Sequence, residues 1–143
     1  MRLAGYASIF GIADSGGDVV RAGAFAREII AARRLPLLWQ HAVDEPIGYI
    51  ERLSEDGRGL RVVARIAADT RRGGDAAALL KVGAIDGLSF GYRVRASVPD
   101  RARGVRVLTD LELLEVSLVT FPMQSRARVI AIQSSTGEPT NDL

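Results

Sequence analysis

Apolar and polar residues alternate along several short stretches of the chain, which is the pattern expected of half-buried β-strands. The clearest stretch is Leu60–Ile66, where every second position is apolar and arginine stands at positions 61 and 65. A similar stretch, Ile47–Ser54, precedes it, and the turn sequence EDGRG at 55–59 joins the two. This arrangement predicts a β-hairpin.

Further strands are predicted where β-branched and aromatic residues gather, at 3–10, 19–20, 37–41, 88–96, 105–108 and 112–119. A first helix is expected over Ala24–Arg34, stopping before Pro36, because proline disfavours the helical conformation in the residue that precedes it. A second is expected over Ala76–Val82, with Asp75 as its N-cap and Gly83 as its stop. The segments 11–18, 69–75 and 98–104 are expected to be loops, and the regular pattern ends at position 122.

Six to eight short strands and two helices predict a mainly β domain of the α+β class. We expect a closed or nearly closed antiparallel β-barrel with short helices packed around it. The length of 143 residues is that of one domain, which we place at residues 1–132. The remaining residues, 133–143 (QSSTGEPTNDL), are polar and are expected to form a disordered tail.

The composition excludes several kinds of functional site. The chain has no cysteine and one histidine, which excludes disulfide scaffolds, thiolate metal centres, cysteine nucleophiles and multi-histidine metal sites. We therefore expect no metal, and we also expect no cofactor. No apolar run approaches the roughly 18 residues of a membrane span, and the first ten residues lack the pattern of a signal peptide. A soluble, intracellular protein without a membrane partner is expected.

The basic residues are almost all arginine. Net charge is only +2, and Lys81 is the single lysine among 19 basic residues. The codon usage of a GC-rich genome would produce this bias, and so would a phosphate-binding surface. The arginines are scattered in pairs, without a long basic run and with few aromatic residues between them. We therefore do not expect nucleic acid to be the main partner.

His41 ends an apolar run, and counting by two places Leu37, Trp39 and His41 on one face of a strand. A histidine there suits a general base, because its ordinary pKa lies close to physiological pH. The alternative is a partly buried histidine that only makes structural hydrogen bonds.

Ser89 lies between two glycines in the sequence Gly87–Tyr92 (GLSFGY), on the strand face opposite Leu88 and Phe90. The glycines would let a peptide backbone approach closely, which a serine nucleophile requires. The Gly-x-Ser-x-Gly spacing is not that of an α/β-hydrolase, because the sequence after the serine is typical of a strand rather than of a helix. The alternative is a small polar residue on a solvent-exposed face.

Glu115 stands within the apolar run Leu113–Val119 (LLEVSLV). A carboxylate there needs a partner, and a histidine N–H is a suitable one, because the carboxylate would orient the ring and stabilise the imidazolium. The alternative is an outward-facing glutamate, or one paired with an arginine. Ser89, His41 and Glu115 are thus the parts of a catalytic triad, although composition does not show that they meet.

Several short segments follow one another along the chain in a specific order and spacing: GYASIF at 5–10, GDVV at 17–20, GAF at 23–25, LLWQH at 37–41, PIG at 46–48, GL at 59–60, LKVGA at 80–84, GLSFGY at 87–92 and LEVSLVT at 114–120. Over about residues 3–130 this series resembles the prohead maturation proteases of tailed bacteriophages, in the HK97-like group, including those of gene transfer agents. That family is itself similar to the herpesvirus assemblin proteases, which implies a herpesvirus-protease-like fold.

The resemblance implies a serine endopeptidase with Ser89 as nucleophile, His41 as base and Glu115 as the acidic third member. It implies cleavage of the scaffold, or of the scaffolding segment of the major capsid protein precursor, together with self-cleavage. The place of action would be the prohead inside the bacterial host cytoplasm, and the resemblance also implies dimerisation.

The chain departs from the family pattern at one place. Herpesvirus enzymes carry an arginine pair soon after the third triad member, which helps to form the oxyanion hole. Here Thr120–Gln124 (TFPMQ) occupies that region, so the oxyanion donors stay unassigned. This departure leaves open a catalytically degenerate module that binds capsid or scaffold protein. The arginine-rich composition leaves a second alternative, a nucleic-acid binder.

Overall fold

The computed structural model describes residues 1–134. In that part of the chain the elements follow one another as β1 (Arg2–Ile9), β2 (Asp18–Val20), α1 (Ala26–Ala31), β3 (Pro36–Trp39), β4 (Ala42–Glu55), β5 (Gly59–Ile66), α2 (Arg71–Lys81), β6 (Gly87–Asp100), β7 (Val105–Val119) and β8 (Val129–Gln133). The predicted mainly β character is confirmed. The expected polar tail begins at Gln133, the last residue of β8, and residues 135–143 lie outside the described part.

The strands form one mixed sheet with the order β2-β7-β3-β4-β5-β1-β8, and β6 pairs with β7. β7 pairs with three other strands, β2, β3 and β6. Along one edge it pairs with β6 in antiparallel fashion, and along the other it pairs in parallel with β2 near its start and with β3 near its end. The end of β7 is therefore flanked by β3 and by the first half of β6.

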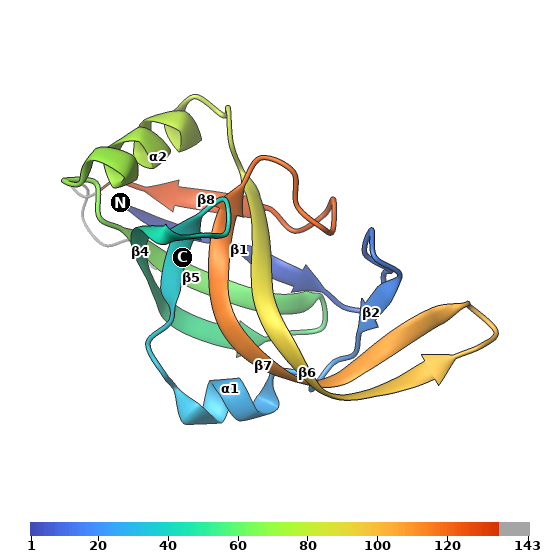
Figure 1. Cartoon of the computed structure of the whole chain (residues 1–143). Helices are drawn as coiled ribbons and strands as arrows, with labels where there is room; N and C mark the ends of the chain where they lie inside the picture. Colours follow the sequence, from blue (N-terminus) through green and yellow to red (C-terminus); the bar gives the residue numbers. More distant parts are fainter. Residues whose placement is uncertain (135–143) are drawn as a thin grey trace.

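The sheet does not close into a barrel, so the predicted closed or nearly closed β-barrel is not supported. Among the described strands, β2 and β8 end the pairing path, and β6 has a ladder with β7 only. One isolated bridge, between Gly87 and Arg128, links the start of β6 to the segment before β8. Beyond that point β6 follows β7 outward as a long hairpin that extends past the rest of the molecule, which leaves no strand to complete a barrel (Figure 1).

The predicted hairpin of β4 and β5 is confirmed, with Ile50 opposite Ala64 and Leu53 opposite Val62. The alternate apolar residues of β5 are buried, as the pattern predicts. They join a core in which the largest fully buried side chains include Phe25, Leu37, Leu60, Leu88 and Leu113. α1 packs on β7 and α2 on β4 and β5, on opposite sides of the molecule in Figure 1.

The start of α2 corrects the sequence prediction. Residues 71–75 belong to the helix and are not a loop, and Thr70 rather than Asp75 is the N-cap, because its Oγ1 accepts a hydrogen bond from Gly73 N (3.0 Å). A side chain at Gly73 would collide with the Ala67 carbonyl oxygen. The glycines that suggested a loop therefore allow the first turn of the helix to lie close to the segment that precedes it. The predicted stop is confirmed, since Gly83 has a left-handed φ of 74°.

Other boundaries also differ from those predicted. α1 is shorter than expected and ends at a left-handed Ala32. The segments 105–108 and 112–119 are one strand, β7, and residues 98–100 of the expected loop belong to β6, because each strand pairs with the other along its length. β8 was not predicted. Its residues alternate between half-buried and exposed, and antiparallel pairing with β1 completes that edge of the sheet.

Candidate active site

The pairing of β6 with β7 brings two of the three candidate residues to one face of the sheet. Ser89 lies opposite Ser117, and Gly91 lies opposite Glu115. Side chains of directly paired residues point to the same face of a sheet, and so do those of residues two apart on a strand. Leu88 and Phe90 point to the other face, as the sequence predicts, where Leu88 is part of the hydrophobic core and the partly buried Phe90 packs against it. Ser89 is buried rather than on an open solvent face, with 4% of its surface exposed.

His41 reaches this face from β3, but not as the sequence predicts. β3 ends at Trp39, and Gln40 and His41 form a two-residue turn between Trp39 and Ala42, which pair with each other. Both turn residues have positive φ, 52° for Gln40 and 59° for His41. A tight hairpin with two left-handed residues favours asparagine and glycine, so glutamine and histidine here are conformationally costly. Period-2 counting failed because the strand ends before His41.

Hydrogen bonds to β7 and the residue after it hold the turn in this costly conformation. Gln40 N donates to the Leu118 carbonyl (2.9 Å) and His41 N donates to Ser117 Oγ (3.0 Å). The Gln40 side chain donates to Thr120 Oγ1 (2.6 Å) and accepts from Thr120 N (3.1 Å). A strained backbone that several hydrogen bonds hold in place is typical of functional sites. The turn therefore fixes the backbone position from which the His41 side chain extends.

The imidazole contacts Glu115 directly. His41 Nδ1–H donates to Glu115 Oε1 over 2.5 Å, and the carboxylate is largely buried while the ring is 41% exposed. The hydrogen bond to Glu115 raises the pKa of His41 above its ordinary value, and its attraction to the negative carboxylate adds to this, while partial burial opposes it. Within residues 1–134 no other group bonds to the ring, so Nε2 is left to exchange a proton.

The Glu115 side chain has room at this position because the residue opposite it on β6 is Gly91, which has no side chain. A Cβ atom at Gly91 would lie 2.5 Å from Glu115 Oε1. The second carboxylate oxygen, Oε2, accepts a hydrogen bond from Ser117 Oγ (2.6 Å). Both oxygens of the buried carboxylate are therefore satisfied, and neither partner is an arginine, which excludes one of the sequence alternatives.

The structure brings His41 and Glu115 into contact, but it does not join Ser89 to His41. In the described chain the Ser89 hydroxyl makes no hydrogen bond. Ser89 lies directly opposite Ser117, which is itself bonded to the backbone of His41. The serine and the histidine thus approach the same residue of β7 from its two sides.

A small pocket lies beside Ser89, between the first half of β6 and residues of β1 and β2. Met123 and Gln124 help to line it, and Gln124 is buried and bonded to the backbone of Ile9. These two residues belong to Thr120–Gln124, the segment that lacks the arginine pair of the herpesvirus enzymes. This segment therefore passes next to Ser89.

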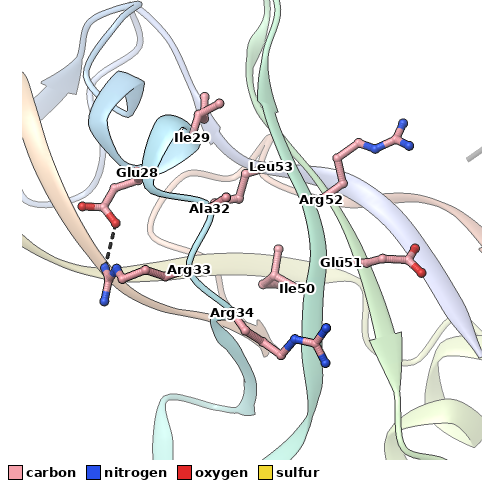
Figure 2. A pocket seen from close by; sticks show the side chains of 9 residues that line it. All are labelled: Glu28, Ile29, Ala32, Arg33, Arg34, Ile50, Glu51, Arg52 and Leu53. Carbon is pink, nitrogen blue, oxygen red and sulfur yellow. Dashed lines mark hydrogen bonds and ion pairs between the residues drawn. The ribbon is translucent and has the colours of Figure 1, made fainter.

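A larger pocket lies elsewhere, between the end of α1 and β4, and contains none of the three candidate residues. Figure 2 shows Ile29, Ile50 and Leu53 toward its middle, while the Arg34 and Arg52 guanidinium groups point away from it. Arg33 turns aside to Glu28 in an ion pair (2.7 Å). This pocket offers no group suited to acyl transfer.

Comparison with known proteins identifies the family. The profile described as caudovirus prohead serine protease matches residues 1–142. The chain belongs to this family. The prohead protease of Enterobacteria phage HK97 is 30% identical over 139 residues, which are 95% of this chain and 62% of that protein. A capsid polyprotein of Pseudomonas phage PAJU2 is 30% identical over 108 residues, 70% of this chain and 16% of that protein. The chain thus spans under two thirds of either relative.

Two solved structures share the fold of this family member. The bacteriophage T4 capsid assembly protease matches with a TM-score of 0.61 at 13% identity, over 82% of this chain and 81% of that one. The protease of KSHV, solved with a hexapeptide phosphonate inhibitor, matches with a TM-score of 0.57 at 11% identity, over 90% of this chain and 63% of that one. The expected likeness to herpesvirus proteases is confirmed at the level of the fold.

Sequence reasoning missed three residues of the site, namely Gln40, Ser117 and Thr120. Gln40 and Thr120 are polar residues next to apolar runs, which is a weak signal. Ser117 carries a better one, because it follows Glu115 by two positions and so shares its strand face. Among residues 1–134 there is no cluster of three or more groups able to hold a metal. No helix in the same range is long and apolar enough to cross a membrane.

Proposed function

We propose that this prohead protease family member is a serine endopeptidase that acts inside the assembling prohead of the bacterial host. Its substrate would be the scaffold, or the scaffolding segment of the major capsid protein precursor, and also its own chain. The single observation that carries the proposal is the His41–Glu115 hydrogen bond on the sheet face that bears Ser89. A histidine held by a carboxylate at Nδ1 presents Nε2 as a general base.

In the proposed reaction, His41 Nε2 takes the proton of Ser89 Oγ as Oγ bonds to the scissile carbonyl carbon. The C–N bond then breaks, and the imidazolium gives its proton to the leaving amine, which leaves an acyl ester on Ser89. Water next loses a proton to His41 while its oxygen bonds to the ester carbon, and the ester C–O bond breaks as Ser89 regains its proton. Glu115 keeps its hydrogen bond to Nδ1 and holds the ring in place throughout.

The relatives support the choice of substrate. One is named a prohead protease, and another is a capsid polyprotein that contains a segment similar to this chain. A protease of this kind joined to a capsid protein would meet its substrate at high effective concentration. We extend this to the present chain as a proposal about its partner, the major capsid protein precursor, and include dimerisation in it.

The missing bond between Ser89 and His41 favours one competing hypothesis, a module that binds capsid or scaffold protein without cutting it. Catalytic hydrogen bonds are often long in a free enzyme and tighten only in the substrate complex, so the gap is compatible with a protease. The two hypotheses differ in what Ser89 does during assembly.

Co-expression with the capsid protein precursor from the same genome separates them, by intact mass of both proteins. We expect the wild-type chain to shorten the capsid protein and Ser89→Ala to leave it whole, because the variant lacks the attacking oxygen. Ser125→Ala is the matched control: it removes an exposed serine whose side chain has no hydrogen bond in the described chain, and should cut as the wild type does.

Two results contradict the proposal in different ways. If neither wild type nor Ser89→Ala cuts the capsid protein although both enter the prohead, the binding module is correct. If both cut it, a different residue is the nucleophile.

A further inference from the structure

We propose that Ser117 is a positioning residue, whose one hydroxyl fixes both the His41 turn and the Glu115 carboxylate. This inference rests on the proposed function and adds a fourth residue to its machinery. Ser117 Oγ lies 2.6 Å from Glu115 Oε2 and 3.0 Å from His41 N. No other described side chain bonds to both residues.

The direction of the two hydrogen bonds follows from the chemistry of the partners. A backbone N–H can only donate and an ionised carboxylate can only accept, while a hydroxyl has one proton and two lone pairs. Ser117 therefore accepts from His41 N and gives its proton to Glu115 Oε2. The hydroxyl has no freedom to rotate without losing one of these bonds.

The position of Ser117 does not require a hydroxyl for packing. The residue is completely buried in β7 and lies opposite Ser89. A buried hydroxyl without partners would be costly, and alanine or valine would fit a strand interior without that cost. Its two bonds to site residues are thus the physical reason for a serine at this position.

Each of the two hydrogen bonds restricts one motion that would move the imidazole ring out of place. A glutamate side chain has several rotatable bonds, and an anchor on Oε2 holds Oε1 toward the imidazole. The backbone bond meanwhile helps to retain His41 at its left-handed φ of 59°. Without Ser117 both the ring and its carboxylate partner are free to relax. The His41–Glu115 bond, which raises the pKa of His41, would then weaken.

The chain has a single histidine, so its ring can be titrated by NMR without assignment ambiguity. The first measurement is the His41 pKa in two full-length chains, Ser89→Ala and the double variant Ser89→Ala with Ser117→Ala. Ser89→Ala is present in both to prevent self-cleavage. Glu115 is the only charged group that shifts this pKa among the described residues. We expect the pKa to fall toward 6.5, its ordinary value, in Ser117→Ala.

Ser8→Ala is the matched control, because Ser8 is also a completely buried strand serine but its Oγ has no hydrogen-bond partner in the described chain. It removes the same atoms without removing a bond to the site. We expect it to leave the His41 pKa unchanged, which separates positioning from a general effect of trimming a buried serine.

The second measurement is the rate at which a fluorophosphonate labels Ser89, followed by intact mass against pH in chains with Ser89 restored. In this step Ser89 Oγ bonds to phosphorus, fluoride leaves, and the serine proton passes to His41. Neutral His41 is required, so labelling should rise as pH passes the His41 pKa. We expect Ser117→Ala to slow labelling about ten- to a hundred-fold, the effect of losing a hydrogen bond to a charged group, and to move the midpoint to lower pH.

If Ser117→Ala does not fold, Ser117→Thr and Ser117→Val decide the matter, because these side chains have the same shape and only threonine keeps the hydroxyl. The proposal expects threonine to keep the raised His41 pKa and valine to lose it. It is overturned if the two variants behave alike, or if Ser117→Ala changes neither the pKa nor the labelling rate relative to Ser8→Ala. If the wild-type chain is never labelled, the proposed function fails, while the NMR titration still tests the role of Ser117.

Discussion

At the scale of single residues, the candidate site depends as much on a missing side chain as on those present. Gly91 lies opposite Glu115, and its lack of a Cβ leaves the volume that the carboxylate occupies. In the sequence, the same glycine suggests close access for a substrate backbone. The structure adds a second reason, because a carboxylate displaced from Gly91 would also move away from His41.

Gly91→Ala tests this reason. The added Cβ would lie 2.5 Å from Glu115 Oε1, so the side chain must shift and the bond to His41 must lengthen. We expect the NMR-measured pKa of His41 to fall toward its ordinary value and proteolysis to slow by tenfold or more, about 1.4 kcal/mol in the transition state. Gly57→Ala is the control, because Gly57 has open space around its Cβ position and no positive φ. An unchanged His41 pKa in Gly91→Ala would show that Glu115 does not need this space.

At the scale of secondary-structure elements, glycine and polar residues misled the prediction of α2. The sequence DTRRGGD at 69–75 has the composition of a loop, yet Arg71 begins an 11-residue helix. Thr70 supplies the missing start signal, since its hydroxyl caps the Gly73 N–H. A helix with two glycines in its first turn is weak by propensity and depends on this cap and on packing against β4 and β5.

Thr70→Ala should therefore lower the free energy of unfolding by about 1 kcal/mol, because the Gly73 N–H loses its capping acceptor. Chemical denaturation of the full chain measures this, read from the midpoint at constant slope. Thr70→Ser keeps the hydroxyl and should retain most of the stability. Equal stability of Thr70→Ala and wild type would mean that packing alone holds the start of α2.

At the scale of the whole molecule, side chains join segments that are far apart in the sequence. Gln124 accepts from Ile9 N (2.8 Å) and donates to the carbonyls of Ile9 (2.9 Å) and Ile12 (3.2 Å). It thereby fixes the segment after β7 to the end of β1, beside the pocket that Ser89 lines. Four arginines also join distant segments, because Arg2, Arg95, Arg106 and Arg128 each pair with a carboxylate more than 40 residues away.

Gln124→Leu should destabilise the whole chain by at least about 2 kcal/mol, because it leaves the N–H and carbonyl of Ile9 buried without these partners. Thermal and denaturant unfolding measure the loss. Ser125→Ala changes the neighbouring exposed position, whose side chain makes no hydrogen bond in the described chain, and should have little effect. A stability equal to wild type would show that water or neighbouring groups replace the amide.

The sequence by itself determined the local features of this protein, because they depend on neighbouring residues. Alternation predicted the hairpin of β4 and β5, and the face of β6 that bears Ser89. The awkward position of Glu115 in an apolar run indicated a polar partner. Chain order and spacing gave the family resemblance, which the profile match confirmed.

Only the tertiary structure decided how these parts combine, since strand pairing joins residues that are distant along the chain. It placed His41 in a left-handed turn rather than on a strand face, because hydrogen bonds to the end of β7 offset the cost of that turn. It left the sheet open where a barrel was expected, because β6 pairs with β7 along its length and forms no second ladder that would close the sheet. It also put Ser117 between Glu115 and the His41 backbone, a contact set by the register of β7 against β3 and β6.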